Sequence, residues 1–305
     1  MRGLCFRLGT HQYPTIILFM PRLWVVSALV LAGWFIVLGS ESSHAAEKAE
    51  VTVLVPDVLT SPGREVRLRA RVVQQGLLGP VGVGGEHVEF IVQGQTVGTV
   101  MTGGDGWAYL AFAPRMRGNH TLTARVLESP RVKANEGTGL LASWERRKPI
   151  LLVDLRATLR TRARPIPPLV PGMPSLVTLA LGEPDPDAVA ELEKLGKFYY
   201  NLMYIVPAES VTVLDLQQWL RQHQFPPGIP RIVEKGAEGL KAFLSQLKQE
   251  GWEHVGAGIG LTKDFAHALV SQRIRTIVLG DPDEREGYPR RTVIVENWKS
   301  VRKHL

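Results

Sequence analysis

The feature that most constrains the fold is a run of four aliphatic residues, Ile150 to Val153, that follows Pro149 and ends at Asp154. The run is too short for a helix and lacks the alternation of a strand with one wet face. It therefore predicts a strand that is buried on both faces of a parallel sheet. Asp154 would then stand at the carboxyl end of a central strand, where open α/β sheets hold their ligands.

The amino-terminal segment has the pattern of a secretory signal. An apolar run, Leu23 to Leu38, follows Arg22 and precedes the small residues Ala45 and Ala46. We expect residues 1–45 to be a signal peptide, with Met20 as its true start, and the protein to be periplasmic, surface-located or secreted. The alternative is an uncleaved run that anchors the protein to a membrane. The only cysteine, Cys5, lies in this segment, so the mature chain would have no disulfide, thiolate metal site or cysteine nucleophile.

The positive charge is scattered along the chain. The net charge is +7, and the dense spots are Arg146–Lys148 and Arg290–Arg291, neither of which is interleaved with aromatic residues. This distribution argues against a nucleic-acid partner. It predicts a solvated surface, with anionic lipid headgroups or cell-envelope polymers as alternative partners.

Residues 46–147 read as an all-β domain. Alternating apolar and polar residues predict strands at 51–55, 66–72, 87–92 and 121–126, with a loop at 76–85 and a tight turn at 102–106. Asp105 in this turn is expected to be a turn former and not a calcium ligand. Such spacing favours a β-sandwich. The strings Val97–Val100, Thr102–Ala108 and Gly118–Leu122 resemble bacterial immunoglobulin-like domains, which implies a spacer or binding module.

Residues 148–305 alternate strand and helix. Strands are predicted at 150–154, 175–181, 198–206, 231–233, 255–259 and 274–279, and helices at 185–195, 211–223, 237–250 and 264–271. The fold class is therefore multidomain: an all-β immunoglobulin-like sandwich followed by a three-layer, Rossmann-like α/β domain.

Three strings of the second domain resemble the haloacid dehalogenase (HAD) superfamily, and most closely its lipin-type and bacterial phosphatidate phosphatase domains. They are the strand that ends at Asp154 with Thr158 four residues on, the segment Lys197–Tyr200 with Leu214–His223 and Phe225–Gly228 after it, and Gly256–Asp264 with the next helix and strand. The resemblance spans Pro149 to about Asn297.

The resemblance implies roles for individual residues. Asp154 matches the nucleophile that becomes an aspartyl phosphate, and Thr158 closes the D-x-D-x-T signature. Lys235 or Lys241 would be the lysine that holds the phosphoryl group, and the sequence does not choose between them. Asp154 and Asp264 would be the carboxylates that hold Mg²⁺.

The sequence departs from that pattern at the residues that carry the chemistry. Arg156 stands in place of the acid/base aspartate and cannot release its proton at physiological pH. Asn201 and Leu202 stand where strand two should end in Ser or Thr, and Ile259 replaces an acidic residue. Arg156 could neutralise Asp154 in a salt bridge, and Arg156 and Asn201 are candidate ligand-binding residues.

We therefore predict an exported protein whose HAD-like domain is non-catalytic and binds a ligand or protein at the cell envelope. The expected partner is a phosphorylated or anionic ligand or an envelope component, and no cofactor is expected. The alternative is a divergent, Mg²⁺-dependent phosphatase that acts on phosphatidate or another phosphomonoester with Asp154 as nucleophile.

Overall fold

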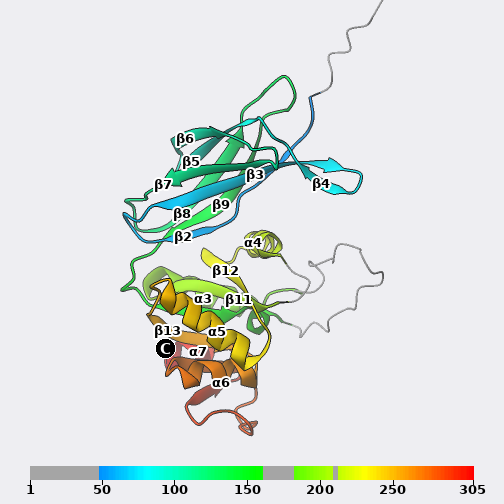
Figure 1. The fold of residues 1–305 in the computed structure, drawn as a ribbon. Coiled ribbons are helices and arrows are strands. Elements are labelled where there is room, and N and C mark those ends of the chain that lie inside the picture. The colour runs from blue at the N-terminus through cyan, green and yellow to red at the C-terminus, as the bar shows by residue number, and fades with distance from the viewer. Residues whose placement is uncertain (1–47, 161–181, 209–211) are drawn as a thin grey trace, which may run out of the picture. The chain divides into compact units, whose positions relative to one another are not determined.

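The computed structural model describes residues 48–160, 182–208 and 212–305. The predicted signal segment, 1–45, and the predicted strand 175–181 lie outside these residues. The described chain forms a β-sandwich followed by an α/β domain (Figure 1). Within the described ranges, no helix has both the length and the apolar character that crossing a membrane requires.

The first domain is an immunoglobulin-like sandwich of two sheets. Its strands are β1 (Thr52–Leu54), β2 (Val58–Thr60), β3 (Val66–Gly76), β4 (Gly79–Gly82), β5 (His87–Val92), β6 (Gln95–Met101), β7 (Trp107–Phe112), β8 (Gly118–Val126) and β9 (Asn135–Ser143). One sheet joins β1, β3, β4 and β7, and the other has the order β2-β9-β8-β5-β6. Alternate residues of both sheets, such as Leu68, Phe90 and Leu122, are fully buried between them. This burial is the physical basis of the alternation in the sequence.

The segment 76–85 is not the simple loop that its glycines suggest. Gly79–Gly82 forms β4, which pairs antiparallel with the end of β3. Leu77 and Leu78 at the turn of this hairpin are fully exposed. The turn at 102–106 is as predicted: it joins β6 to β7, and Asp105 Oδ1 accepts the Trp107 N–H at 3.1 Å.

The imidazole of His120 on β8 gives the sandwich a pH-dependent term. The residue is 6% exposed, its Nδ1 lies 2.6 Å from Gln93 Nε2, and its Nε2 has no hydrogen-bond partner among the described residues. Burial lowers the pKa of His120 below its ordinary value of 6.5. The folded state therefore binds fewer protons than the unfolded state as the pH falls below that value.

We expect His120 to contribute stability that is present above pH 6.5 and lost as the pH falls through its lowered pKa. The contribution to the slope is at most about 1.4 kcal/mol per pH unit, since one proton is involved. Urea unfolding of the protein and of a His120→Gln variant, at pH 5 to 8, checks this. An identical pH slope in the two proteins would contradict it.

The second domain is a parallel sheet between two layers of helices. The strand order is β12 (Gly228–Val233), β11 (Asn201–Pro207), β10 (Ile150–Asp154), β13 (Val255–Gly260), β14 (Arg275–Leu279) and β15 (Thr292–Val295), and every pair is parallel. The helices are α3 (Pro186–Phe198), α4 (Val213–Gln222), α5 (Gly236–Gln249), α6 (Lys263–Ser271) and α7 (Trp298–Val301).

The helices divide between the two faces of this sheet. The apolar residues of α3, α4 and α7 join one buried cluster with Leu151 and Val153 of β10. Those of α5 and α6 join another with Leu152 of the same strand. All five residues of β10 are buried, as the aliphatic run predicts. The domain is therefore the three-layer, Rossmann-like architecture that the sequence indicates.

Several boundaries differ from the sequence prediction, and β12 begins at Gly228, three residues before the predicted strand 231–233. The sequence pattern starts the second strand at residue 198, but α3 continues to Phe198 and β11 begins only at Asn201. Phe198 and Tyr199 are consequently more than half exposed. The series also does not end at Leu279, because β15 and α7 follow and extend the sheet by one strand.

Candidate functional site

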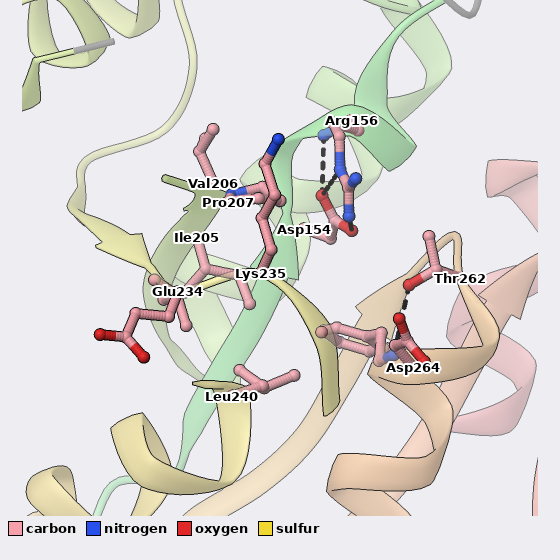
Figure 2. Close-up of a pocket in the computed structure, with 13 residues that line it drawn as sticks. Asp154, Arg156, Ile205, Val206, Pro207, Glu234, Lys235, Leu240, Thr262 and Asp264 are labelled. Carbon is pink, nitrogen blue, oxygen red and sulfur yellow. Dashed lines mark hydrogen bonds and ion pairs between the residues drawn. The ribbon is translucent and has the colours of Figure 1, made fainter. Parts of the chain in front are cut away.

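A cavity of about 230 Å³ lies where β10, β11 and β12 end and where α5 and α6 begin (Figure 2). Its lining residues are Asp154, Arg156, Ile205, Val206, Pro207, Val233, Glu234, Lys235, Gly236, Leu240, Thr262, Asp264 and Phe265. It is placed there by topology, since parallel strands bring their carboxyl ends to one edge of the sheet. The position of Asp154 in the sequence predicts this location.

Asp154 is 2% exposed, and both its carboxylate oxygens are engaged by Arg156. Arg156 donates from Nε to Oδ1 at 3.0 Å, from Nη2 to Oδ2 at 2.8 Å and from its backbone N–H to Oδ1 at 3.1 Å. The backbone bond caps the short 3₁₀ helix Leu155–Thr158. Figure 2 shows the guanidinium group facing the carboxylate. This is the paired, charge-assisted geometry that arginine forms with carboxylates.

The pair changes what Asp154 can do. A nucleophilic carboxylate needs an oxygen that can approach phosphorus, and a metal ligand needs one that can face a cation. Here both oxygens accept hydrogen bonds from the guanidinium, so a phosphoryl group or a cation would have to compete with Arg156 for them. This ion pair stands where the resemblance implies a Mg²⁺ site. In the described part of the chain, no group of three or more His, Cys, Asp or Glu side chains could hold a metal ion.

Thr158 is fully buried and lies outside the lining of the cavity. Its hydroxyl donates to the Leu155 carbonyl at 2.7 Å, inside the 3₁₀ helix. A second hydrogen bond holds the same 3₁₀ helix, since Trp298 Nε1 donates to the Ala157 carbonyl at 3.0 Å. Thr158 therefore shapes the turn after β10 and does not contact a ligand in the cavity.

The structure separates the two candidate lysines. Lys235 lines the cavity and is the N-cap residue of α5, followed by Gly236 at φ 85°. Lys241 lies further along α5, outside the cavity lining, and its Nζ is 2.7 Å from Glu238 Oε1. Lys235 is therefore the lysine that can reach a ligand at this edge.

Asp264 reaches the cavity from the first turn of α6 and is exposed. Thr262 is the N-cap of that helix, and its Oγ1 accepts the Phe265 N–H at 3.2 Å. In Figure 2, Asp264 and Asp154 approach the cavity from different elements, and Asp154 faces Arg156. The structure brings the two aspartates to one cavity, where the carboxylate of Asp154 is already paired with the guanidinium of Arg156.

Asn201 does not lie at the cavity. It pairs in register with Ile150, at the amino end of β10, whereas Asp154 pairs with Ile205. Its Nδ2 donates to the Lys148 carbonyl at 3.3 Å. The prediction that Asn201 stands at the end of strand two is wrong: it opens β11, and the cavity lies at the other end of that strand. The residues at the cavity are the apolar Ile205, Val206 and Pro207.

Comparisons with known proteins leave the family open, since no protein-family model and no curated protein matches the chain. Solved structures with some likeness include fibronectin(III)-like modules of CbhA from Clostridium thermocellum, at 13% identity over 32% of this chain and 47% of theirs, with a TM-score of 0.23. The CARDB domain of the PF1109 protein from Pyrococcus furiosus has 22% identity over 32% of this chain and 93% of its own, with a TM-score of 0.22.

A longer stretch, 70% of this chain, is similar to 28% of a cycloisomaltooligosaccharide glucanotransferase from Paenibacillus sp., at 11% identity and a TM-score of 0.27. The chain therefore spans about half of the CbhA modules and less than a third of this enzyme. Likenesses this weak carry no information about function. The function must therefore be inferred from the cavity itself.

Proposed function

We propose that the α/β domain is a non-catalytic, HAD-like domain that binds a small anionic ligand, such as a phosphorylated one, in an exported protein at the cell envelope. One observation carries the proposal: Arg156 holds both oxygens of Asp154. The residue that the resemblance makes the nucleophile is thereby occupied. Its neighbour two positions on, Arg156, cannot serve as an acid or base.

The cavity suits an anionic group beside an apolar one. Lys235 contributes a cation, and no side chain of the described residues caps the amino end of α5, whose first N–H groups lie beside Gly236 at the cavity. Helix amino ends and lysines both favour phosphate. Ile205, Pro207 and Leu240 form an apolar wall. The volume of about 230 Å³ is below the roughly 300–1,000 Å³ of most ligand sites, which favours a small phosphomonoester or a headgroup.

The catalytic part of the proposal is tested by hydrolysis of phosphatidate and of p-nitrophenyl phosphate with Mg²⁺. We expect the purified protein and an Asp154→Asn variant to give the same background rate. Turnover by the unaltered protein that Asp154→Asn abolishes would overturn the proposal. It would establish the divergent phosphatase instead.

The binding part is tested with inorganic phosphate, titrated by calorimetry. We expect Lys235→Met to weaken binding about fivefold, because a partly exposed charge contact contributes about 1 kcal/mol. Lys241→Met is the matched control, since it removes the same charge from the same helix outside the cavity. Equal losses in the two variants, or no binding by the unaltered protein, would refute the assignment of the cavity.

A further inference from the structure

The outer face of the β1-β3-β4-β7 sheet carries three arginines beside two aromatic rings. Along β3, three arginines alternate with the fully buried Leu68, Ala70 and Val72, so their side chains share the face that points away from the core. Along β7, two aromatics flank the fully buried Ala108 and share the same face. We call this set, Arg67, Arg69, Arg71, Trp107 and Tyr109, the Arg–aromatic face.

The register of the two strands builds the Arg–aromatic face. Arg69 pairs with Tyr109 and Arg71 with Trp107 across the antiparallel ladder. The two rings stack with centroids 6.0 Å apart and planes 20° apart. The Cζ atom of Arg67 lies 5.6 Å from the Tyr109 centroid, and those of Arg69 and Arg71 lie 5.9 and 5.8 Å from the Trp107 centroid. All three distances are within the range of cation–π contacts.

The turn before β7 holds one end of this arrangement in place. Asp105 Oδ1 accepts the Trp107 N–H, and the Asp105 carbonyl accepts a hydrogen bond from Arg71 Nε at 3.2 Å. Gly106, at φ 80°, could not take a Cβ, which would overlap the Val72 carbonyl. The aromatic rings are therefore presented on an ordered strand and not on a loose loop.

The charge of the Arg–aromatic face is not balanced within the described residues. None of its three arginines has a carboxylate within ion-pair distance there, although alternate residues on a strand bring like charges to about 7 Å of each other. Arg125 on the other sheet shows the contrast, with Glu136 at 3.2 Å and Glu89 at 3.7 Å. An anion on the face would relieve this repulsion.

A shallow hollow adjoins the Arg–aromatic face. It measures about 440 Å³ and is lined by Arg67, Arg69, Tyr109 and the residues Asp57–Leu59. Tyr109 is 48% exposed, and Arg67 and Arg69 are exposed as well. Asp57, the acidic residue of the hollow, accepts the Leu140 N–H at 2.7 Å. The cations and the ring are thus open to a ligand.

We propose that the Arg–aromatic face binds an acidic polysaccharide. The guanidinium groups match the carboxylates of an acidic glycan, and the exposed parts of the Trp107 and Tyr109 rings offer apolar surface to the C–H groups of its sugars. Single-stranded nucleic acid would also stack on aromatic rings. The predicted export favours the polysaccharide, because acidic glycans are the usual anionic polymers of a cell envelope. The inference is independent of the α/β cavity.

The test uses the full chain and polygalacturonate, a linear polymer with one carboxylate per sugar. Binding is measured by calorimetry, and Trp107 adds a fluorescence signal, because the other tryptophans of the described chain, Trp144, Trp219, Trp252 and Trp298, are at most 6% exposed. We expect a change in tryptophan fluorescence at low salt and weaker binding as salt is raised. Dextran, which is neutral, should not bind.

Variants decide whether the Arg–aromatic face is responsible. We expect Arg67→Gln with Arg69→Gln to weaken binding about tenfold, or about 1.4 kcal/mol, and Trp107→Ala to do at least as much. Arg290→Gln with Arg291→Gln removes the same charge from the α/β domain and should leave binding unchanged. Thermal midpoints confirm that the variants fold.

Four outcomes would overturn the proposal. They are no binding of polygalacturonate, equal losses in the two double variants, equal binding of dextran, and tighter binding of oligo(dT) than of polygalacturonate. The second would mean attraction by net charge alone. The fourth would make the face a nucleic-acid platform.

Discussion

Arg156→Met is expected to reduce the free energy of unfolding by about 3 kcal/mol at pH 7. Asp154 is 2% exposed, so removing the guanidinium would leave a buried carboxylate without a cation. Breaking a buried pair costs about 3–5 kcal/mol. The lower end applies because the Arg156 side chain is 37% exposed and water can take part of its place.

Asp154→Asn combined with Arg156→Met is the control for this prediction. It removes the buried charge together with its partner, so it should recover a large part of the loss at pH 7. Urea unfolding followed by tryptophan fluorescence measures the recovered free energy, since Trp298 is hydrogen-bonded to the Ala157 carbonyl in the turn beyond Arg156. Two results would contradict the stabilising role of the ion pair. One is an Arg156→Met variant as stable as the unaltered protein, and the other is a double variant no more stable than Arg156→Met alone.

The sequence is most informative where burial alone decides the structure. The aliphatic run of β10 can only be satisfied inside a sheet covered on both faces, and its end at Asp154 locates the cavity. The adjacent Arg156 makes the ion pair predictable, because two residues joined by a tight turn need no long-range register to meet. Helix positions follow from periodicity in the same local way.

The sequence misleads where local preference and tertiary packing disagree. Phe198 and Tyr199 have strand-like side chains, yet they end a helix that is anchored by Leu192 and Leu195 at helical spacing. The misplacement of Asn201 has another origin: the match to the family's motif put it at the end of strand two, whereas it opens β11 at the opposite edge of the sheet. β15 escapes sequence prediction because it is short and follows a charged turn.

The Arg–aromatic face could not be predicted for a different reason. Its arginines and its rings come from strands separated by β4, β5 and β6, and only the register of β3 with β7 brings them together. A shift of one residue in the register of either strand would turn the arginines of β3, or the aromatic rings of β7, towards the core. In the sequence, β3 and β7 each have the ordinary alternation of a strand, so only the structure shows that the arginines and the rings lie side by side.

Gly258→Ala should reduce the free energy of unfolding by about 2–3 kcal/mol, because the new methyl group would overlap the side chains of α6, the helix that forms one wall of the cavity. Gly258 lies in β13 beside Leu152 of β10, and α6 covers it so closely that a Cβ would overlap Leu269 Cδ2 and meet Phe265 Cζ at 2.9 Å. Such overpacking typically costs about 1–3 kcal/mol, and here Leu269 is fully buried with little room to move. Gly280→Ala is the matched control, because its nearest neighbour would be Ile294 Cγ2 at an ordinary 3.8 Å.

Relief of the overlap gives the sharper measurement. Leu269→Ala alone should also destabilise the protein, but combined with Gly258→Ala the loss should be smaller than the sum by at least about 1 kcal/mol, because the smaller side chain makes room for the new methyl group. Since α6 begins with Thr262 and carries Asp264 to the cavity, Gly258→Ala should also weaken phosphate binding, and the double variant should restore part of it. Additive losses in urea unfolding would show that the strand and not the helix yields, and that the packing of α6 on Gly258 does not set this wall of the cavity.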